Sequence, residues 1–276
     1  MAAASTAPGH PQITCLRAAN LSPLTLAGTN SYVVGRDPAY VIDPGPDDPE
    51  HIESIRAAID ERGGLGGILL THSHADHSAG AAVLGGELLW GEPDQGDEAS
   101  ALAAASSDPA VATLPGQQAS DGAAPAARVG PFEVIPTPGH ASDHACFLLG
   151  RVCFCGDLIL GSGSSIVPPA AGGGSLLDYM ASLARLTELD LELLCPGHGP
   201  WIESPSEKIA EYVRHRTERA AKLVAALDSG ERSRARLLEL AWDDVPAELR
   251  SAAALALQAH LEKLGAEGRE IHELRD

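Results

Sequence analysis

The histidine-rich segment at residues 71–78 is the feature that most limits what this chain can fold into. It reads Thr-His-Ser-His-Ala-Asp-His-Ser and directly follows residues 68–70, a short apolar run that predicts a buried strand. His72 and His74 stand two residues apart in an extended segment leaving that strand, so both side chains can face one point. The Asp-His pair at 76–77 follows where the chain turns into a helix, and it can face a second point nearby. Because imidazole nitrogen and carboxylate oxygen are donors that Zn²⁺ accepts, the segment predicts a metal site rather than a polar loop.

Three other predicted strands are each followed by a glycine and then by a histidine or an aspartate. His140 follows the strand at 132–135, Asp157 follows the strand at 151–155, and His198 follows the strand at 191–194. Ligand side chains at several strand ends meet at one edge of a sheet. The preceding glycines let the backbone turn sharply, so that each side chain points outward. The segments together therefore predict a single metal centre.

These motifs resemble the five-part signature of the metallo-β-lactamase fold, an α/β architecture. Asp43, in the run Val-Ile-Asp-Pro-Gly, matches the aspartate that ends an early strand of that fold. The resemblance implies an αββα sandwich over residues 1–205 with the metal at one edge. It also implies seven metal ligands, namely His72, His74 and His140 on one ion, Asp76, His77 and His198 on the other, and Asp157 bridging them.

The finer similarity is to lactamase-beta-2-like proteins, the subgroup that resembles ribonuclease Z and glyoxalase II. It rests on the segments 26–32, 137–144, 156–161, 178–183, 195–200 and 212–216. The similarity covers nearly the whole chain except residues 91–130, which are rich in Ala, Gly and Ser and predict a surface excursion. A second glycine-rich stretch at 161–174 predicts a mobile loop.

The resemblance implies a dinuclear metal-dependent hydrolase with two Zn²⁺ per chain, and Mn²⁺ or iron are alternatives. Two ions about 3.5–4 Å apart share a hydroxide and polarise the electrophile at the same time. Asp76 is expected to act in catalysis as well, by orienting that hydroxide. Zinc β-lactamases commonly carry Cys or Ser in place of Asp157, so the aspartate indicates a substrate other than a β-lactam. Flavodiiron proteins carry an acidic residue where this chain has His74, which argues against di-iron redox chemistry.

Several polar residues have two interpretations each. Asp43 either accepts a hydrogen bond from a ligand imidazole or caps a turn with the following Pro-Gly. His144 either acts in catalysis, by stabilising the reacting centre, or only satisfies hydrogen bonds within its loop. Residues 29–31 either line the site or form a polar turn, and Tyr179 is expected to be a packing residue.

The composition changes after Pro205. Residues 206–276 hold 12 Lys and Arg against 14 Asp and Glu, while residues 1–205 hold 7 against 24. A long amphipathic helix over 207–227, helices near 233–241 and 247–264, and a terminal ribbon at 269–272 predict a winged-helix-like domain over residues 206–276. The basic residues Lys208, Arg214, His215, Arg216, Arg219 and Lys222 of the long helix form either a phosphate-tracking face or a solvated surface, and the second interpretation is preferred.

The charge balance guides the choice of substrate. The whole chain carries −19, which argues against a nucleic-acid or anionic-membrane binder. The preferred substrate is therefore a small thioester or ester. The alternatives are single-stranded RNA, cleaved at its phosphodiesters, and a non-catalytic nucleic-acid-binding protein.

The remaining features concern the compartment. The five cysteines have no framework spacing, so they predict buried packing thiols in a reducing compartment. The first residues lack the features of a signal peptide, and no apolar run reaches the length of a membrane helix. The sequence therefore predicts a cytoplasmic protein, and it leaves the oligomeric state open, a homodimer included.

Overall fold

The computed structural model describes residues 3–93 and 127–275. Its strands are β1 (Ala3–Ala7), β2 (His10–Arg17), β3 (Asn30–Val34), β4 (Ala39–Ile42), β5 (Leu65–Leu69), β6 (Leu88–Trp90), β7 (Ala127–Val129), β8 (Phe132–Pro136), β9 (Ala145–Leu149), β10 (Val152–Gly156) and β11 (Leu193–Pro196). Its helices are α1 (Pro49–Asp60), α2 (Ala75–Ser78), α3 (Gly80–Leu84), α5 (Leu176–Thr187), α6 (Pro205–Asp228), α7 (Arg234–Ala241) and α8 (Arg250–Ala266), with short 3₁₀ turns at Ala170–Gly172 and Ala247–Leu249.

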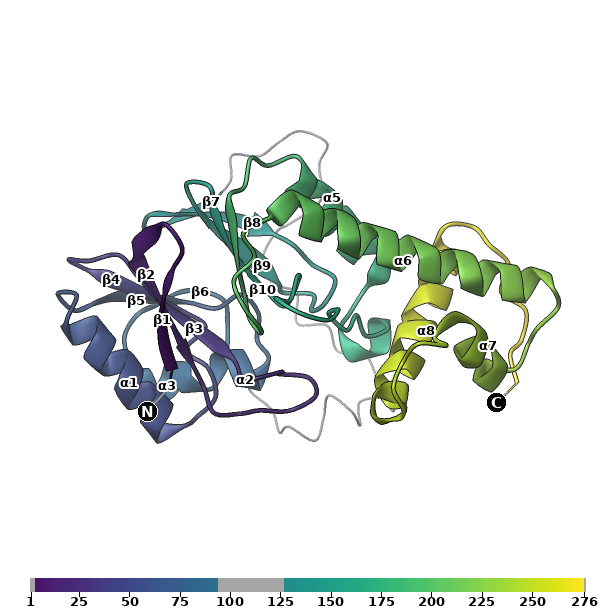
Figure 1. The fold of residues 1–276 in the computed structure, drawn as a ribbon, viewed down its shortest axis with the longest axis horizontal. Helices are drawn as coiled ribbons and strands as arrows, with labels where there is room; N and C mark the ends of the chain where they lie inside the picture. The colour runs from purple at the N-terminus through teal and green to yellow at the C-terminus, as the bar shows by residue number, and fades with distance from the viewer. Residues whose placement is uncertain (1–2, 94–126, 276) are drawn as a thin grey trace.

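The strands form two sheets that pack face to face, as the family resemblance implied. One sheet has the order β1-β2-β3-β4-β5-β6, and the other has the order β11-β10-β9-β8-β7. Helices α1 and α3 lie on the outer side of the first sheet, while α5 and the start of α6 lie on the outer side of the second (Figure 1). The arrangement is the expected αββα sandwich.

Strand β10 shows why the second sheet is buried on both faces. Val152 and Phe154 join the cluster between the sheets, whereas Cys153 and Cys155 join the cluster under α5. Alternate residues of a strand point to opposite faces, so a strand covered on both sides reads as an unbroken apolar run. All five cysteines are buried free thiols, which confirms their prediction as packing residues.

Some element boundaries differ from the prediction. Strand β5 is Leu65–Leu69 rather than 68–70, and it includes Gly66 and Gly67, where neighbouring side chains leave no room for a Cβ. A Cβ at Gly67 would lie 2.4 Å from Leu89 Cδ1, and one at Gly66 would lie 2.6 Å from Pro38 Cγ. Strand β11 is Leu193–Pro196 rather than 191–194, since its pairing with β10 starts at Leu193.

The excursion predicted for residues 91–130 falls largely outside the described residues, but its last part forms strand β7 at the edge of the second sheet. The stretch 161–174, predicted to be a mobile loop, is partly packed against the protein, since residues 165–169 are buried or half-buried whereas residues 162–164 and 170–173 are exposed. Ser165 and Val167 within it are 3% and 1% exposed. Strands β1 and β2 were not predicted, because β1 consists of small residues and carries no apolar alternation.

The C-terminal helices pack through a cluster of their own. Leu223 and Leu227 of α6 meet Leu237 of α7 and Leu257 of α8. The predicted terminal ribbon at 269–272 is wrong: the described residues there form no strand, and pairing is limited to a bridge between Ser233 and Arg275. Helix α7 begins at Arg234, directly after Ser233, so the chain has no further extended residues there to pair with the C-terminal segment.

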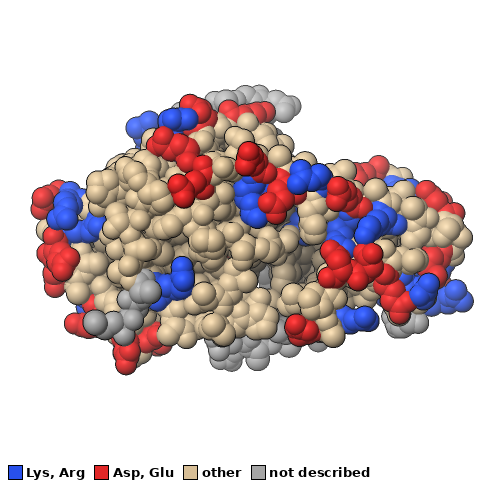
Figure 2. Space-filling view, in the orientation of Figure 1, with Lys and Arg blue, Asp and Glu red and all other residues tan. Residues whose placement is uncertain are grey.

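The basic residues of α6 are largely paired or buried. Lys208 lies 2.9 Å from Glu211 and Lys222 lies 2.7 Å from Asp243, while Arg216 and Arg219 are each 5% exposed. In the view of Figure 2, basic and acidic side chains are interspersed over the region where α6 to α8 lie. The preferred interpretation as a solvated surface therefore holds for Arg214 and Lys222, which are exposed, and is wrong for Arg216 and Arg219, which are buried. Among the helices that the structure describes, none has an apolar stretch long enough to cross a membrane.

Replacing Phe154 tests the packing between the sheets. Its ring is fully buried and meets Tyr32 and Phe132 edge-on, with centroid distances of 5.3 and 5.9 Å. We expect Phe154→Ala to lower the free energy of unfolding by about 3–5 kcal/mol, measured by urea denaturation. Leu177→Ala, at a residue that is 44% exposed, should change it by less than about 0.5 kcal/mol. Similar losses in both variants would contradict this packing.

Candidate metal centre

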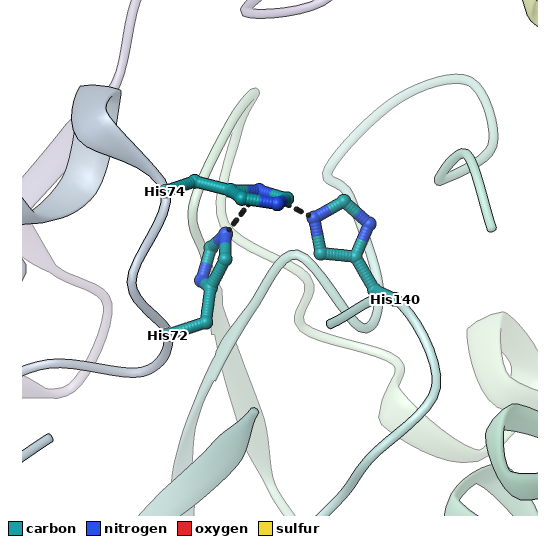
Figure 3. Close-up of side chains that lie close together, drawn as sticks. All are labelled: His72, His74 and His140. Carbon is teal, nitrogen blue, oxygen red and sulfur yellow. Dashed lines mark hydrogen bonds between the residues drawn. The ribbon is translucent and has the colours of Figure 1, made fainter. Parts of the chain in front are cut away.

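Three histidines from two loops converge on one point at the edge of the sandwich. His72 and His74 follow β5, and His140 follows β8. The Nε2 atoms of His72 and His140 each lie 3.0 Å from Nδ1 of His74 (Figure 3). Ring nitrogens that close must share a proton or an ion, so this group can hold one metal.

A second group of donors lies beside the first. The Nε2 atoms of His77 and His198 are 3.3 Å apart. Oδ2 of Asp76 lies 3.5 Å from the first of these nitrogens and 3.3 Å from the second. Asp76 and His77 are on the short helix α2, whereas His198 follows β11 in the other sheet. This group can hold a second metal.

Asp157 lies between the two groups. Its Oδ2 is 3.3 Å from His198 Nε2 and 3.8 Å from His140 Nε2. Its Oδ1 is 3.5 Å from His77 Nε2 and has no hydrogen-bond partner among the described residues, although it is buried. A buried carboxylate oxygen without a donor is costly, and a cation would satisfy it. The structure thus brings together every residue that the sequence predicted as a ligand.

Contacts on the far side of the imidazoles determine which nitrogen is free. His77 Nδ1 donates to Asp43 Oδ2 at 2.9 Å, and His140 Nδ1 donates to the carbonyl of Ile166 at 2.7 Å. Thr71 donates its hydroxyl to Asp43, so it accepts from His72 Nδ1 at 3.0 Å. In His72 and His140 the proton therefore sits on Nδ1 and the lone pair of Nε2 faces the donor groups, whereas His77 keeps Nδ1 on Asp43 and directs Nε2 toward them.

Asp43 supports this arrangement from a buried position. It is 2% exposed, and its carboxylate accepts from both the backbone N–H and the hydroxyl of Thr71, each at 2.7 Å. Its φ is 49°, in the left-handed region that a non-glycine residue rarely adopts. The predicted contact with a ligand imidazole is present.

Two imidazoles of the first group, His72 and His74, are neutral near physiological pH. Burial, followed by the charge of His140, lowers the pKa of His74 to about 4. Burial and the charge of His77 hold the pKa of His72 well below its ordinary value. Neutral imidazoles bind a divalent ion without first losing a proton.

The second group carries charge. Burial lowers the pKa of His198, but the charge and hydrogen bond of Asp157 outweigh burial and raise that pKa to about 9. The charges of Asp76 and Asp157 likewise raise the pKa of His77 well above 6.5, again against burial. Burial would raise the pKa of Asp76, but His77 and His198 outweigh it and lower the value to about 2. Cations are therefore favoured at this point, whether protons or metal ions.

Two glycines leave room for the centre. A Cβ at Gly197 would lie 2.3 Å from Asp157 Oδ1 and 2.6 Å from His77 Cε1. A Cβ at Gly156, whose φ is 44°, would lie 2.5 Å from Thr71 Oγ1. These residues fit a dinuclear metal group, since the donors converge and the backbone beside them has no side chain.

The secondary candidates fall in different places. Thr29 Oγ1 donates to Asp76 Oδ2 at 3.3 Å, so it lines the site. Asn30 donates to the carbonyls of Pro196 and Gly199, and it therefore holds the turn that carries His198. Ser31 instead contacts His51, and fully buried Tyr179 donates to Leu158, which confirms it as a packing residue.

His144 lies outside both donor groups. It is 1% exposed, and its Nδ1 contacts Thr137 Oγ1 at 2.8 Å. Burial and the charge of His140 lower its pKa to about 3, so it is neutral. Its catalytic role stays a prediction.

Sequence reasoning missed three contributors. Thr71 was counted only as the start of the histidine-rich segment. Ser165 and Ile166 contact Asp157 and His140 from a loop that was predicted to be mobile. The position of Thr71, between a buried strand and the first ligand, was a usable signal, whereas the other two contacts depend on the fold.

Comparisons with known protein families agree with this geometry. Residues 24–198 match the family model described as the metallo-beta-lactamase superfamily. Residues 235–273 match the model described as the beta-lactamase associated winged helix domain. The second match covers most of α7 and all of α8, so a winged-helix domain is present at the C-terminal end, and α6 lies outside the matched residues.

Individual proteins are similar over most of the chain. A lactamase-like protein adaB from Aspergillus niger is 35% identical over 79% of this chain and 63% of its own length. An atrochrysone carboxyl ACP thioesterase from Passalora fulva is 30% identical over 79% of this chain and 62% of its own. The chain thus spans somewhat less than two thirds of these fungal relatives. The crystal structure of the metallo-beta-lactamase family protein TTHA1429 from Thermus thermophilus has a TM-score of 0.70 and 26% identity, with 95% of each chain covered.

Filling the space at Gly197 tests the fit of the metal group. We expect Gly197→Ala to weaken metal binding by at least about tenfold, because its methyl group displaces Asp157 and His77. Zinc content after dialysis against a chelator would measure this. Gly265→Ala is the control, since a Cβ there meets nothing within 4 Å. It should raise stability by up to about 1 kcal/mol and leave the metal content unchanged. Normal zinc content in Gly197→Ala would contradict the assignment.

Metal binding should release protons. The pKa of His198 is raised to about 9, so at about pH 7.5 the metal-free protein holds an additional proton on this ring. That proton must leave before the ring binds a metal. The apparent zinc affinity is therefore expected to rise with pH and to level off as pH passes about 9. Calorimetric titration in two buffers of different ionisation enthalpy would count the protons. A binding enthalpy independent of the buffer at neutral pH would count against this charge distribution.

Proposed function

Because this chain belongs to the metallo-beta-lactamase superfamily, whose members include hydrolases, we propose that it is a dinuclear zinc hydrolase acting on small thioester or ester substrates. The observation that carries the proposal is the position of Asp157, with its Oδ2 between His140 and His198 at 3.8 and 3.3 Å. A short carboxylate shared by two donor groups suits two adjacent cations. The nitrogen and oxygen donors favour Zn²⁺, and they also suit manganese or iron.

The chain's own residues would position the reacting groups. When bound, two divalent ions would supply a nucleophile at neutral pH and polarise the acyl carbonyl. The Asp76 side chain is 30% exposed, whereas those of His77 and His198 are almost fully buried. Asp76 thus faces the substrate side, and its pKa of about 2 keeps it ionised. Its carboxylate can orient a nucleophile by accepting its hydrogen bond, while Thr29 holds it in place.

Two observations favour an acyl substrate over RNA. Relatives named as thioesterases are 30% and 32% identical to this chain over three quarters of its length or more. The net charge of −19 repels a polyanion, and most basic residues of α6 are paired with Asp or Glu or are buried. The free cysteines agree with a reducing compartment, and we propose the cytoplasm.

Hydrolysis of model thioesters tests the proposal. We expect zinc-loaded protein to cleave S-acyl N-acetylcysteamine probes and to leave a labelled unstructured RNA oligomer intact. Asp157→Ala should lower kcat/KM by about hundredfold or more, since several kcal/mol of charge stabilisation at the transition state are lost. Asp47→Ala removes an exposed carboxylate outside the donor groups and should leave the rate unchanged.

The RNA arm decides between the alternatives. Internal cuts in the oligomer that disappear in Asp157→Ala would identify a ribonuclease and overturn the argument from charge. Zinc-loaded protein that cleaves neither probe would contradict the thioester assignment.

A further inference from the structure

Helix α6 carries two buried arginines, Arg216 and Arg219, that are built alike and face different parts of the protein. Each is 5% exposed, donates to a backbone carbonyl and lies over an aromatic ring. Arg219 binds Ala241 O and lies over Trp242, within the C-terminal cluster. Arg216 points the other way, toward the loop beside the metal centre.

The two arginines differ in their charge partners. Arg219 lies 2.5 Å from the carboxylate of Asp244. Arg216 has no carboxylate partner in the described part of the chain; it binds Ser165 O and lies 5.2 Å from the centroid of the Tyr179 ring. Burying a guanidinium without a counter-charge costs stability. The hydrogen bond to the Ser165 carbonyl partly offsets this cost and fixes the position of that carbonyl.

Ser165 and its neighbour contact His140 of the first group and Asp157, which lies between the two groups. Ser165 Oγ donates to the backbone carbonyl of Asp157 at 2.5 Å. The carbonyl of Ile166 accepts from His140 Nδ1 at 2.7 Å, the contact that leaves Nε2 of that ring free. Ser165 is itself 3% exposed. A guanidinium that holds the Ser165 carbonyl therefore fixes the two-residue segment Ser165–Ile166, whose side-chain hydroxyl and following carbonyl contact both ligands.

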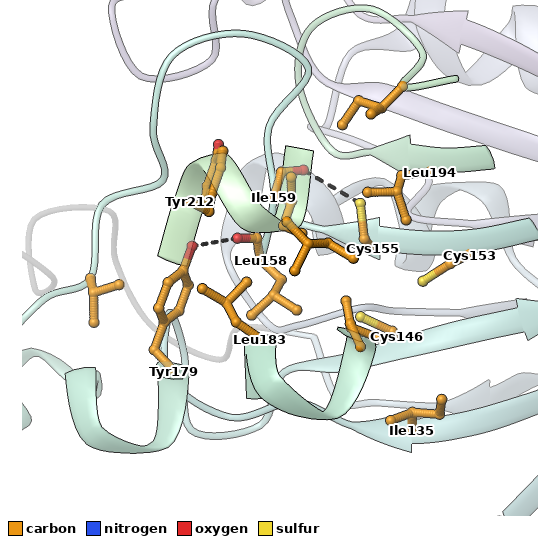
Figure 4. Packing of buried hydrophobic residues seen from close by; sticks show 14 of the residues in the cluster. Ile135, Cys146, Cys153, Cys155, Leu158, Ile159, Tyr179, Leu183, Leu194 and Tyr212 are labelled. Atoms are coloured by element: carbon orange, nitrogen blue, oxygen red, sulfur yellow. Dashed lines mark hydrogen bonds between the residues drawn. The ribbon is translucent and has the colours of Figure 1, made fainter. Parts of the chain in front are cut away.

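Tyr212, one turn before Arg216 on α6, holds the same loop. Its hydroxyl accepts from Leu160 N at 2.9 Å and donates to Gly163 O at 3.1 Å. Tyr179 of α5 adds a bond to the Leu158 carbonyl at 2.5 Å (Figure 4). The segment from residue 158 to 166 is thus held at four points, and α6 supplies three of them.

We infer that Arg216, assisted by Tyr212, is a positioning residue for the metal centre. It acts through Ser165 and Ile166 on the orientation of Asp157 and His140. The inference rests on the proposed metal centre and extends it to a helix outside the matched region 24–198. Metal affinity then depends on α6, and not only on the ligands and their strands.

Metal affinity of matched variants tests the inference. We expect Arg216→Met to weaken Zn²⁺ or Co²⁺ binding by about 10–100-fold, as loss of an outer hydrogen-bond partner does in metal sites. Arg216→Lys should recover part of the loss, since one ammonium can still reach the Ser165 carbonyl. Chelator competition would give the affinity, and the visible absorption spectrum of bound Co²⁺ would report the changed geometry at His140 and Asp157.

Arg219→Met is the matched control. It removes an equally buried arginine with a similar ring contact from the same helix, so it should lower the melting temperature but leave affinity and spectrum unchanged. Tyr212→Phe removes only a hydroxyl and should weaken metal binding in a folded protein, whereas Tyr40→Phe on β4 should not. These readouts need no substrate, so a failed thioesterase assay leaves the inference standing.

Three outcomes would overturn it. Wild-type affinity and spectrum in Arg216→Met would show that the loop holds its geometry without α6. Equal loss of metal in Arg219→Met would show a general effect of stability. Wild-type protein that binds no metal would remove the proposed centre itself, and with it this inference.

Discussion

The carboxylate of Asp43 is the interaction on which the metal centre most depends. It binds both donors of Thr71 and the Nδ1 proton of His77. Through the Thr71 hydroxyl it also fixes the Nδ1 proton of His72. A single buried charge at the end of β4 thereby fixes the free nitrogen of one imidazole in each donor group. The backbone at Asp43 has a φ of 49°, a strained conformation that a non-glycine residue keeps only where surrounding contacts hold it.

The centre also requires the two sheets to be held together at one edge. Ala145 N at the start of β9 donates to the carbonyl of Thr71 at 2.7 Å, and Asn30 N of β3 donates to Gly197 O at 2.8 Å. Tyr32 of the first sheet donates to Pro196 O at 2.7 Å, just before His198. Ligands on separate sheets can share a carboxylate only because these hydrogen bonds fix one sheet edge against the other. The cluster between the sheets supplies the stability, and the bonds at the edge supply the geometry.

The ligands could be predicted because they lie in short segments that follow strands, and Asp157, His140 and His198 each follow a glycine. Such a pattern is local, so it can be recognised in the sequence without knowledge of the fold. Ser165 could not be found in this way, because no local pattern marks its contact with Asp157, and its contact with Arg216 joins residues 51 positions apart. Arg216 itself looked like part of a solvated helix face, since helical periodicity says which residues share a face but not what covers it. Strand β1 was missed because small residues carry no apolar alternation.

Helix α6 connects the metal centre to the C-terminal helices. Its first half places Ile209 and Tyr212 in the cluster beneath α5, and its second half places Leu223 and Leu227 in the cluster with α7 and α8. The change in composition after residue 205 therefore does not coincide with a gap in packing. A helix that belongs to two hydrophobic clusters is held at both ends, and this rigidity suits a residue that must keep a loop in place. The winged-helix unit thus has a physical role that requires no nucleic acid, because it anchors the helix that carries Arg216.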